Sequence, residues 1–406
     1  METQRSQDWI VVGGGMTGSA LAYELAAQGC SVLLLEQDVE LRGGSRFGYG
    51  GVAFWAGTTD LMRQICAEGR EQLRSLAAQL DHDIQYRELD LVLTVPPGVE
   101  PETALAPYQT CAMPPQWVDV ATACDLEPLL NPQAISGALT VKHGHLHLGE
   151  LVIAYRQALQ RLGGTIEFDT VTGFCRDRTG QITGVKTGDT EWSAKQVVVC
   201  AGAWGRSLLK AAGITVPLYF THAELIETPP VDLTLRSLVM PAQTQRFELE
   251  ATASAATTDG LWDEPGHELT PPILDAGAIQ FLDGSLRLGQ ISRTLTDPSA
   301  AIAVQESEQQ LRQQVGAVLP ALQSLPGTWH RCLVSFSRDR LPLVGDIPGT
   351  TGLYVFSGFS NPLAIVSPLA HRFAAAVTGQ PDPCLESLTP HRFCDRLPVM
   401  STGSVR

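Results

Sequence analysis

Lysine and runs of basic residues are nearly missing from this sequence. It has only four lysines, none of them after residue 210: Lys142, Lys186, Lys195 and Lys210. The formal net charge is −15. Proteins that bind nucleic acids usually present a basic patch, so this composition disfavours RNA or DNA as a partner.

Paired cysteines and long apolar runs are missing as well. The nine cysteines are scattered and odd in number, and none forms a C-x-x-C pair. This pattern indicates free thiols in a reducing compartment, and it disfavours a disulfide framework or a zinc site. No apolar run approaches the length of about 20 residues that a membrane span needs, and the first eight residues are polar. We therefore expect a soluble, cytoplasmic protein without a signal peptide.

The N-terminal region combines two apolar runs with a glycine-rich turn. Residues 9–12 and 31–35 predict buried parallel strands, and residues 19–28 have the apolar spacing of a helix. A G-x-G-x-x-G motif lies between the first strand and the helix. In this setting the motif predicts a dinucleotide-binding fold.

The glycines of this motif have separate steric roles. Gly13 makes the tight turn, Gly15 lets the backbone approach a pyrophosphate, and Gly18 lets the helix pack closely on the strand. The pyrophosphate would lie at the helix N-terminus, where unpaired N–H groups favour negative charge. Glu36 ends the second strand and can accept hydrogen bonds from the ribose hydroxyls. The motif alone does not choose between NAD and FAD, but its N-terminal position favours FAD.

A second glycine-rich segment spans residues 41–51. It contains Arg42, Ser45 and Arg46, which can donate to a phosphate or to the edge of a flavin. We interpret the segment as lining the cofactor; the alternative is a flexible surface loop.

Apolar spacing predicts the remaining elements. Helices are expected at 58–80, within 118–130, at 151–162, from 205, at 300–319 and at 362–378. Strands are expected at 84–95, 165–168, 197–200, 218–226, 247–251, 278–282, 286–289, 332–336 and 354–356. The region from 218 to 300 should therefore be rich in strands and contain no helix. Residues 96–115 indicate a loop, and 381–406 a polar tail.

Three histidines stand at alternate positions, 143, 145 and 147. Alternation in a strand would place their imidazoles on one side. No carboxylate or cysteine ligand stands at a fixed spacing from them, so we do not expect a metal site.

The order of four motifs resembles the D-amino-acid-oxidase-like family of FAD-dependent oxidoreductases, which includes glycine oxidase, sarcosine oxidase and D-amino acid dehydrogenase. The motifs are the N-terminal glycines with Glu36, VVVCAGAW at 197–204, RDRLPLVG at 338–345, and residues 352–368. The resemblance covers nearly the whole chain. It implies an α/β fold in which a Rossmann-like FAD-binding domain interleaves with an antiparallel-sheet α+β substrate domain. The expected boundaries are 1–80, 145–215 and 330–380 for FAD binding, 81–144 and 216–329 for the substrate domain, and 381–406 for a tail.

The resemblance also implies the residues that contact FAD. The helix that begins at Pro362 would point its positive end at the pyrimidine side of the flavin. The expected cofactor-binding residues are Gly13, Gly15, Met16, Thr17, Gly18, Glu36, Arg42, Ser45, Arg46, Gly50, Val171, Gly202, Trp204, Asp339, Gly345, Gly358, Ser360, Asn361, Pro362 and Leu363.

The sequence departs from the family pattern at four places, one of which is the segment 359–362, where FSNP replaces the usual small glycine-rich turn beside the flavin. Many relatives have an arginine that pairs with the substrate carboxylate, but that position falls on Val334 or its neighbours Leu333 and Ser335. Where some members attach FAD to a cysteine, this chain has Ser337 and Arg338, so non-covalent FAD is expected. The lysine that activates oxygen in those members has no counterpart in 211–406. Possible replacements for the missing carboxylate-binding arginine are Arg246, Arg287, Arg293 and Arg331.

We therefore expect an FAD-dependent enzyme that oxidises the CH–NH bond of an amino acid or secondary amine to an imine by hydride transfer to flavin N5. Oxygen, a quinone or a protein would accept the electrons. The candidate catalytic residues are Tyr49, Tyr219, His222 and Arg246. The alternatives are oxidation of a hydroxy acid or another non-amine substrate, and an electron-transfer flavoprotein without a small substrate of its own. Residues 338–345 are also similar to the FAD domain of a tRNA-modifying enzyme, but the acidic charge disfavours that role.

Overall fold

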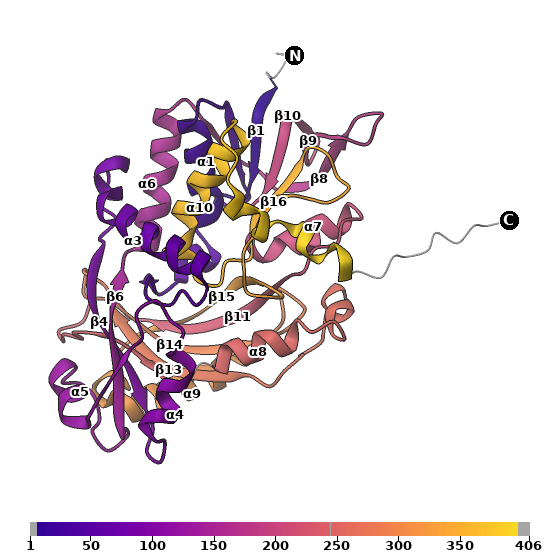
Figure 1. The fold of residues 1–406 in the computed structure, drawn as a ribbon. Helices are drawn as coiled ribbons and strands as arrows, with labels where there is room; N and C mark the ends of the chain where they lie inside the picture. Colours follow the sequence, from indigo (N-terminus) through magenta and orange to yellow (C-terminus); the bar gives the residue numbers. More distant parts are fainter. Residues whose placement is uncertain (1–5, 244, 397–406) are drawn as a thin grey trace.

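Two large sheets make up the frame of the molecule. The computed structural model describes residues 6–243 and 245–396. The first sheet, in the upper half of Figure 1, has the order β16-β17-β10-β1-β2-β7, with β8 and β9 attached beside β10. The second sheet, in the lower half, has the order β15-β11-β14-β13-β12-β4-β6-β3, with β5 beside β6. The expected α/β class, a parallel dinucleotide-type sheet combined with a largely antiparallel one, is confirmed.

The first sheet has a parallel centre. Its parallel strands are β1 (Gln7–Val12), β2 (Val32–Glu36), β7 (Thr165–Phe168), β10 (Thr190–Val199) and β17 (Leu353–Ser357). An antiparallel edge is formed by β16 (Leu343–Asp346), and β8 (Val171–Arg176) and β9 (Ile182–Thr187) form a small meander. In β1, Val11 pairs with Leu34 of β2 and Val198 of β10. Because both faces of this sheet are covered, its central strands are continuous apolar runs.

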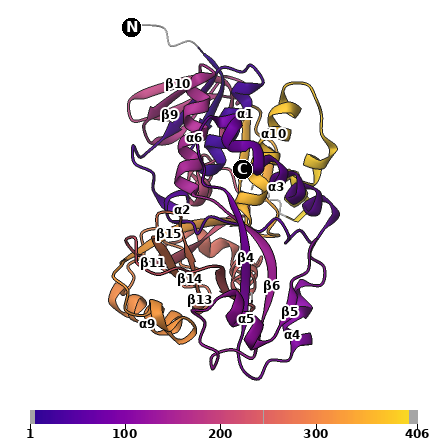
Figure 2. The same ribbon diagram turned by 90° about the vertical axis from the view of Figure 1, so that its left-hand side faces the viewer.

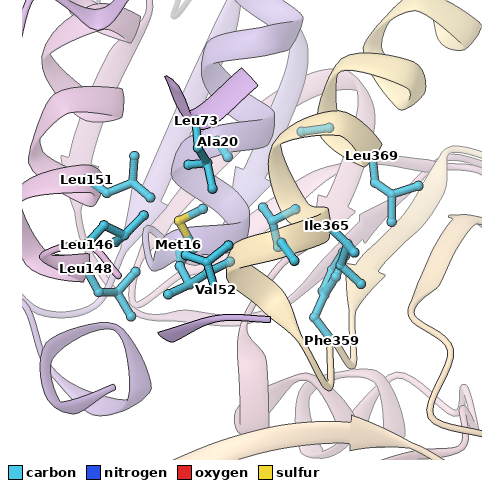
Figure 3. Packing of buried hydrophobic residues seen from close by; sticks show 14 of the residues in the cluster. Met16, Ala20, Val52, Leu73, Leu146, Leu148, Leu151, Phe359, Ile365 and Leu369 are labelled. Atoms are coloured by element: carbon cyan, nitrogen blue, oxygen red, sulfur yellow. The ribbon is translucent and has the colours of Figure 1, made fainter. Parts of the chain in front are cut away.

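Helices from distant parts of the chain cover one face of the first sheet. They are α1 (Met16–Ala27), α6 (Leu148–Arg161) and α10 (Pro362–Val377), which Figure 2 shows in the upper part of the molecule, while α3 (Asp60–Leu80) packs on α10 and α6. Their buried side chains meet in one core, where Met16, Ala20, Leu151, Ile365 and Leu369 are fully or almost fully buried (Figure 3). None of the described helices is both long and apolar enough to cross a membrane.

The second sheet is mostly antiparallel. Its strands are β3 (Gly51–Val52), β4 (Arg87–Val95), β5 (Gln116–Val118), β6 (Gly137–His145), β11 (Leu218–Glu227), β12 (Leu238–Pro241), β13 (Ile273–Gln280), β14 (Leu286–Arg293) and β15 (Thr328–Ser337). Helix α9 (Val304–Val318) packs its buried Leu311 and Val315 against this sheet. The predicted hairpin around Asp283-Gly284 is confirmed as β13–β14.

Two predictions about local structure were wrong. Residues 247–251 form part of α8 (Gln245–Ala253) and not a strand, so the region before residue 300 does contain a helix. Its sequence, QRFELEATA, is rich in good helix formers, and the buried Leu249 and Ala253 stand four residues apart. The expected loop at 96–115 contains α4 (Pro101–Leu105) and a 3₁₀ turn at 106–108.

The remaining short elements complete the chain. They are α2 (Gly43–Phe47), α5 (Val120–Leu126), α7 (Gly205–Ala211), and 3₁₀ turns at 202–204, 259–263, 320–322, 383–388 and 390–396. The expected tail therefore contains two 3₁₀ turns, and its residues 397–406 lie outside the described part. The whole of β15 pairs with β11 of the second sheet, from Ser337 opposite Leu218 to Thr328 opposite Glu227. The segment expected to bind FAD from residue 330 onward thus begins inside the other sheet, and the domain boundaries remain a proposal.

Candidate active site

A cavity of about 1820 Å³ is lined by residues of both sheets. Pockets for drug-sized ligands occupy roughly 300–1,000 Å³. The cavity is therefore large enough for a dinucleotide together with a small substrate. Its lining includes the glycine turn after β1 from the first sheet and residues of α8, β13 and β15 from the second sheet and its helix.

The glycine turn brings the backbone close to the cavity. Gly13 has a φ of +103°, and a Cβ there would lie 2.7 Å from the carbonyl oxygen of Cys200. A Cβ on Gly18 would overlap the carbonyl oxygen of Gly13, so α1 packs directly on the turn. The N–H of Met16, in the first turn of α1, donates to Ser45 Oγ at 2.9 Å. The N-terminus of α1 and the second glycine-rich segment thus meet at the wall of the cavity.

Glu36 fixes the same turn from the end of β2. Its Oε2 accepts from the Gly14 N–H at 2.6 Å, and its Oε1 accepts from the Asp38 N–H at 3.1 Å. Arg156 of α6 donates from Nη2 and Nε to the Gly14 carbonyl at 2.6 and 3.1 Å. Burial lowers the pKa of Arg156, and the charge of Glu36 opposes this effect. Sequence reasoning missed Arg156, because a lone arginine in a helix carries no motif.

Most of the residues expected to bind the cofactor line this cavity. They are Gly13, Gly15, Met16, Thr17, Glu36, Arg42, Ser45, Gly50, Val171, Gly202, Trp204, Asp339, Ser360, Asn361, Pro362 and Leu363. Four others are not part of its lining. Gly18 lies under the turn, Gly345 packs on Thr389, and Gly358 packs on Leu218 and Ser337. Arg46 makes a bidentate ion pair with Glu227 at 2.7 and 2.9 Å.

A C-terminal turn holds Asp339, in the segment before α10. Arg392 donates to the two carboxylate oxygens of Asp339 at 2.8 and 3.0 Å and to the carbonyl of Leu341 at 2.9 Å. Burial disfavours the charge of Asp339, but Arg392 holds the pKa of that carboxyl below its ordinary value. The 390–396 turn therefore fixes the loop that lines the cavity in front of α10.

A cluster of polar residues lines the part of the cavity formed by α8 and β13. Two of its members, Tyr49 and Arg246, were expected as catalytic residues, and both line the cavity. The Tyr49 hydroxyl is buried and has no hydrogen-bond partner in the described part of the chain. Burial raises the pKa of Tyr49 far above its ordinary value, so the hydroxyl stays protonated. Arg246 donates from Nε to Glu250 Oε1 at 2.7 Å. Although burial disfavours its charge, Glu250 holds the pKa of Arg246 above its ordinary value.

Asp275 of β13 belongs to this cluster and was missed by sequence reasoning. It lines the cavity, and burial raises its pKa to about 6 against the opposing charge of Arg246. The available signal was an acidic residue within the apolar strand ILDAGAIQ. Cys332 of β15 also lines the cavity, and burial raises the pKa of its thiol to about 11.

The other two candidate catalytic residues lie outside the cavity lining. Tyr219 donates its hydroxyl to Asp259 Oδ1 at 2.5 Å and accepts from Arg338 Nη2 at 2.9 Å. The ring of His222 is buried, with Nε2 3.2 Å from the Leu295 carbonyl, and burial lowers the pKa of His222 to about 4. Both side chains are thus engaged within the protein.

The four possible replacements for the carboxylate-binding arginine have different partners in the structure. Arg287 donates to backbone carbonyls of the second glycine-rich segment, and Arg293 donates to Glu224 at 2.6 Å. Arg331 lines the cavity and donates to the Ala300 carbonyl. Of these four arginines, only Arg246 interacts electrostatically with both Asp275 and Cys332.

The three histidines have separate partners. His143 Nδ1 accepts from the Trp55 indole N–H at 2.9 Å, and His145 Nε2 lies 3.1 Å from the Tyr49 carbonyl. Burial lowers the pKa of each of these two rings to about 3. His147 Nδ1 accepts from the Glu150 N–H at the start of α6. Within 6–243 and 245–396, no group of three or more His, Cys, Asp or Glu side chains is arranged to hold a metal ion.

Comparison with known proteins gives the family. The family profile described as FAD dependent oxidoreductase (DAO) matches residues 8–376. The chain belongs to this family. As an FAD-dependent oxidoreductase it uses FAD as its cofactor, and the glycine turn, the start of α1 and Glu36 are suited to a dinucleotide.

Individual relatives are distant. Glycine oxidase of Pseudomonas putida is 24% identical over 393 residues, which cover 92% of this chain and 95% of that protein. The 4-methylaminobutanoate oxidase of Paenarthrobacter nicotinovorans is 25% identical over 228 residues, which cover 55% of this chain and 28% of that protein. The crystal structure of glycine oxidase from Geobacillus kaustophilus superposes with a TM-score of 0.77 at 18% identity, covering 95% of this chain and 98% of that one. The structural likeness concerns the fold.

Proposed function

We propose that this oxidoreductase oxidises the CH–NH bond of an amino acid or secondary amine to an imine. The observation that carries the proposal is the polar cluster of Tyr49, Arg246 and Asp275 in the same cavity as the dinucleotide cradle. A guanidinium and a carboxylate complement a substrate that carries both a carboxylate and an amine. The oxidases of glycine and 4-methylaminobutanoate act on substrates of this kind.

The chain would hold FAD along the glycine turn. The N-terminus of α1 would receive the pyrophosphate, Glu36 the ribose, and the N-terminus of α10 the pyrimidine side of the flavin. When bound, FAD supplies the chemistry by accepting a hydride equivalent from the substrate carbon. The hydrogen bonds of Arg156 and Glu36 to the turn keep this cradle in place before the cofactor binds.

The residues at the substrate end of the cavity would bind the substrate and orient it. Arg246 is held by Glu250, which leaves its Nη atoms available for the two oxygens of a carboxylate. Tyr49 also lines the cavity, but its protonated hydroxyl is buried beside Gly289, so we assign it no contact with the substrate. Apolar side chains, including Leu91, Leu225 and Leu238, line the cavity and exclude water from the reacting C–H.

Anaerobic bleaching of the flavin absorbance tests this proposal. The purified holoprotein is mixed with a panel of amino acids, secondary amines and hydroxy acids, and a chemical reductant shows that the flavin is competent. We expect amino acids or secondary amines to bleach the flavin and the matching hydroxy acids not to do so. Bleaching by hydroxy acids alone would refute the proposal, and bleaching by no compound would favour an electron-transfer role.

A pair of variants tests the placement of the substrate. Arg246→Gln should raise the substrate concentration needed for half-maximal bleaching at least tenfold, because a charged hydrogen-bond pair is lost. Arg331→Gln is the control, since Arg331 lines the cavity but lies outside the polar cluster. Equal effects of the two substitutions would contradict the assignment of Arg246.

A further inference from the structure

Asp275 lies at a deformation of the second sheet. On β13, the register with β14 shifts between Leu274 and Gly277, so one extra residue is accommodated there. On β14, the register with β11 shifts at the same level, between Ile291 and Gly289. Bulges of this kind re-aim side chains and are frequent beside active sites. Both Asp275 and Gln290, at the two bulges, line the cavity.

The carboxylate of Asp275 lacks a partner. Within the residues that the structure describes, its side chain makes no hydrogen bond and no ion pair, although the residue is only partly exposed to solvent. The ionisable groups that interact with it are Arg246 of α8, Tyr49 after α2, and Tyr108 of the 106–108 turn. Arg246 pairs through Nε with Glu250 and forms no ion pair with Asp275, and the Tyr108 hydroxyl donates to the Ala242 carbonyl at 2.6 Å. A shielded carboxylate without a cation is costly unless a ligand supplies one.

The geometry points to a substrate class. We propose that Asp275 binds the ammonium group of the substrate and takes one of its N–H protons, while Arg246 binds the carboxylate of the same molecule. This inference rests on the proposed amine oxidation and deepens it. The preferred substrates are then zwitterions whose amine and carboxylate are close together, and Asp275 is a substrate-contacting catalytic residue.

The proton transfer completes the reaction. A protonated amine has no lone pair to form a C=N bond, so one N–H bond must break before the substrate carbon is oxidised. That proton forms an O–H bond on Asp275, and the nitrogen keeps the electron pair. The substrate carbon would then give up its hydrogen with two electrons, which bound FAD would accept, and the nitrogen lone pair would form the C=N bond. The hydrogen and the two electrons lost by the substrate carbon equal those gained by FAD. The proton on Asp275 passes to solvent when the product leaves.

The pH dependence of ligand binding follows from the protonation state of the Asp275 carboxyl. Burial raises the pKa of Asp275 to about 6, and Arg246 opposes the shift. Below that pH the protonated carboxyl no longer attracts an ammonium group. Binding of a cationic ligand should therefore weaken as the pH falls from 7 to 5, whereas binding of the same ligand without its nitrogen should not.

The test uses ligand pairs that differ only in the amine. Glycine is compared with acetate, and L-proline with cyclopentanecarboxylate, by anaerobic titration calorimetry and flavin difference spectra on the holoprotein. The variants are Asp275→Asn, which removes the charge, Asp275→Glu, which keeps it, and Asp232→Asn, which makes the same substitution at an exposed position outside the cavity lining. Flavin content and melting temperature show whether each variant is folded.

The wild type should prefer at least one amine ligand over its partner by tenfold or more. Asp275→Asn should abolish the preference, Asp275→Glu should retain part of it, and Asp232→Asn should leave it unchanged. For a ligand that bleaches the flavin, the bleaching rate of Asp275→Asn should follow the fraction of free amine and rise about tenfold per pH unit.

Three results separate the two proposals. Preference for the amine that depends on Asp275, without bleaching by any amine, would support the inference and refute the proposed oxidation. Bleaching with the same pH profile in the wild type and Asp275→Asn would overturn the inference and leave the oxidation standing. A wild type that prefers neither amine ligand would also overturn the inference. Should Asp275→Asn fail to fold, the pH dependence of wild-type binding and the Asp275→Glu variant still test the role of Asp275.

Discussion

Replacing Glu36 by alanine should weaken FAD binding and also lower the free energy of unfolding of the apoprotein. The carboxylate accepts from the Gly14 and Asp38 N–H groups at 2.6 and 3.1 Å, and it lines the cavity where the ribose is expected. A hydrogen bond to a charged group contributes about 1.5–3 kcal/mol. Two lost ribose bonds, partly replaced by water, should cost about 2–4 kcal/mol of binding, or roughly 30- to 1,000-fold in Kd.

The free energy of unfolding of the apoprotein should fall independently. Glu36→Ala leaves the buried Gly14 N–H without its acceptor, which should cost about 1–3 kcal/mol. FAD affinity is measured by titrating the apoprotein and following flavin fluorescence, and stability is measured by urea unfolding without FAD. In both assays Glu36→Gln should lie between the wild type and Glu36→Ala, because its amide keeps one oxygen acceptor. Asp38→Asn is the control: it removes a charge two residues away that makes only a long, partly exposed ion pair with Arg42, so we expect changes within about 0.5 kcal/mol. A Glu36→Ala protein that purifies with full flavin content would refute the role of Glu36.

Four further outcomes are expected. Acid precipitation of the holoprotein should release yellow flavin into the supernatant, because burial keeps the cavity-lining Cys332 protonated and poorly nucleophilic; flavin in the pellet would show a covalent link. Reduced flavin mixed with aerated buffer should reoxidise slowly, because 211–406 contains no lysine to stabilise superoxide, and reoxidation at the rate of a dedicated oxidase would contradict this. Gly18→Ala should fail to accumulate as flavin-loaded protein, since its Cβ would overlap the Gly13 carbonyl; a normal yield with normal flavin content would show that α1 can move away. The free energy of unfolding should fall as the pH drops below about 6.5, because buried His143 and His145, whose pKa values are about 3 in the fold, take up protons once unfolded; a stability that is constant between pH 7 and 4 would exclude this linkage.

The dinucleotide end of the cavity follows local rules and was therefore predictable. Strand, glycine turn and helix are consecutive in the chain, so the roles of Gly13 and Gly18 were predicted from spacing alone. Arg156 supports the same turn from α6, more than 140 residues away, and only tertiary packing brings it there. Arg46 has the right chemistry for a phosphate, but Glu227 on a distant strand already binds it.

The substrate end depends on contacts that no local pattern encodes. Short amphipathic runs such as 247–251 fit a strand or a helix equally well, and here the helix places Arg246 at the cavity. Asp275 reaches the cavity through a bulge that is visible only in the pairing of three strands. Tyr219 and His222 were chosen for their side-chain chemistry, but β11 directs both into partners within the protein.

The position of β1 in the first sheet has a consequence during synthesis. One of its neighbours, β2, follows within about 25 residues, whereas the other, β10, is complete only at Val199. At about 5–20 residues per second, the ribosome needs roughly 10–40 s to make that second partner. During this time one edge of β1, an apolar strand, offers unpaired N–H and C=O groups to any strand nearby. Nascent chains of this protein should therefore depend on chaperones that shield the β1–β2 unit until β10 emerges.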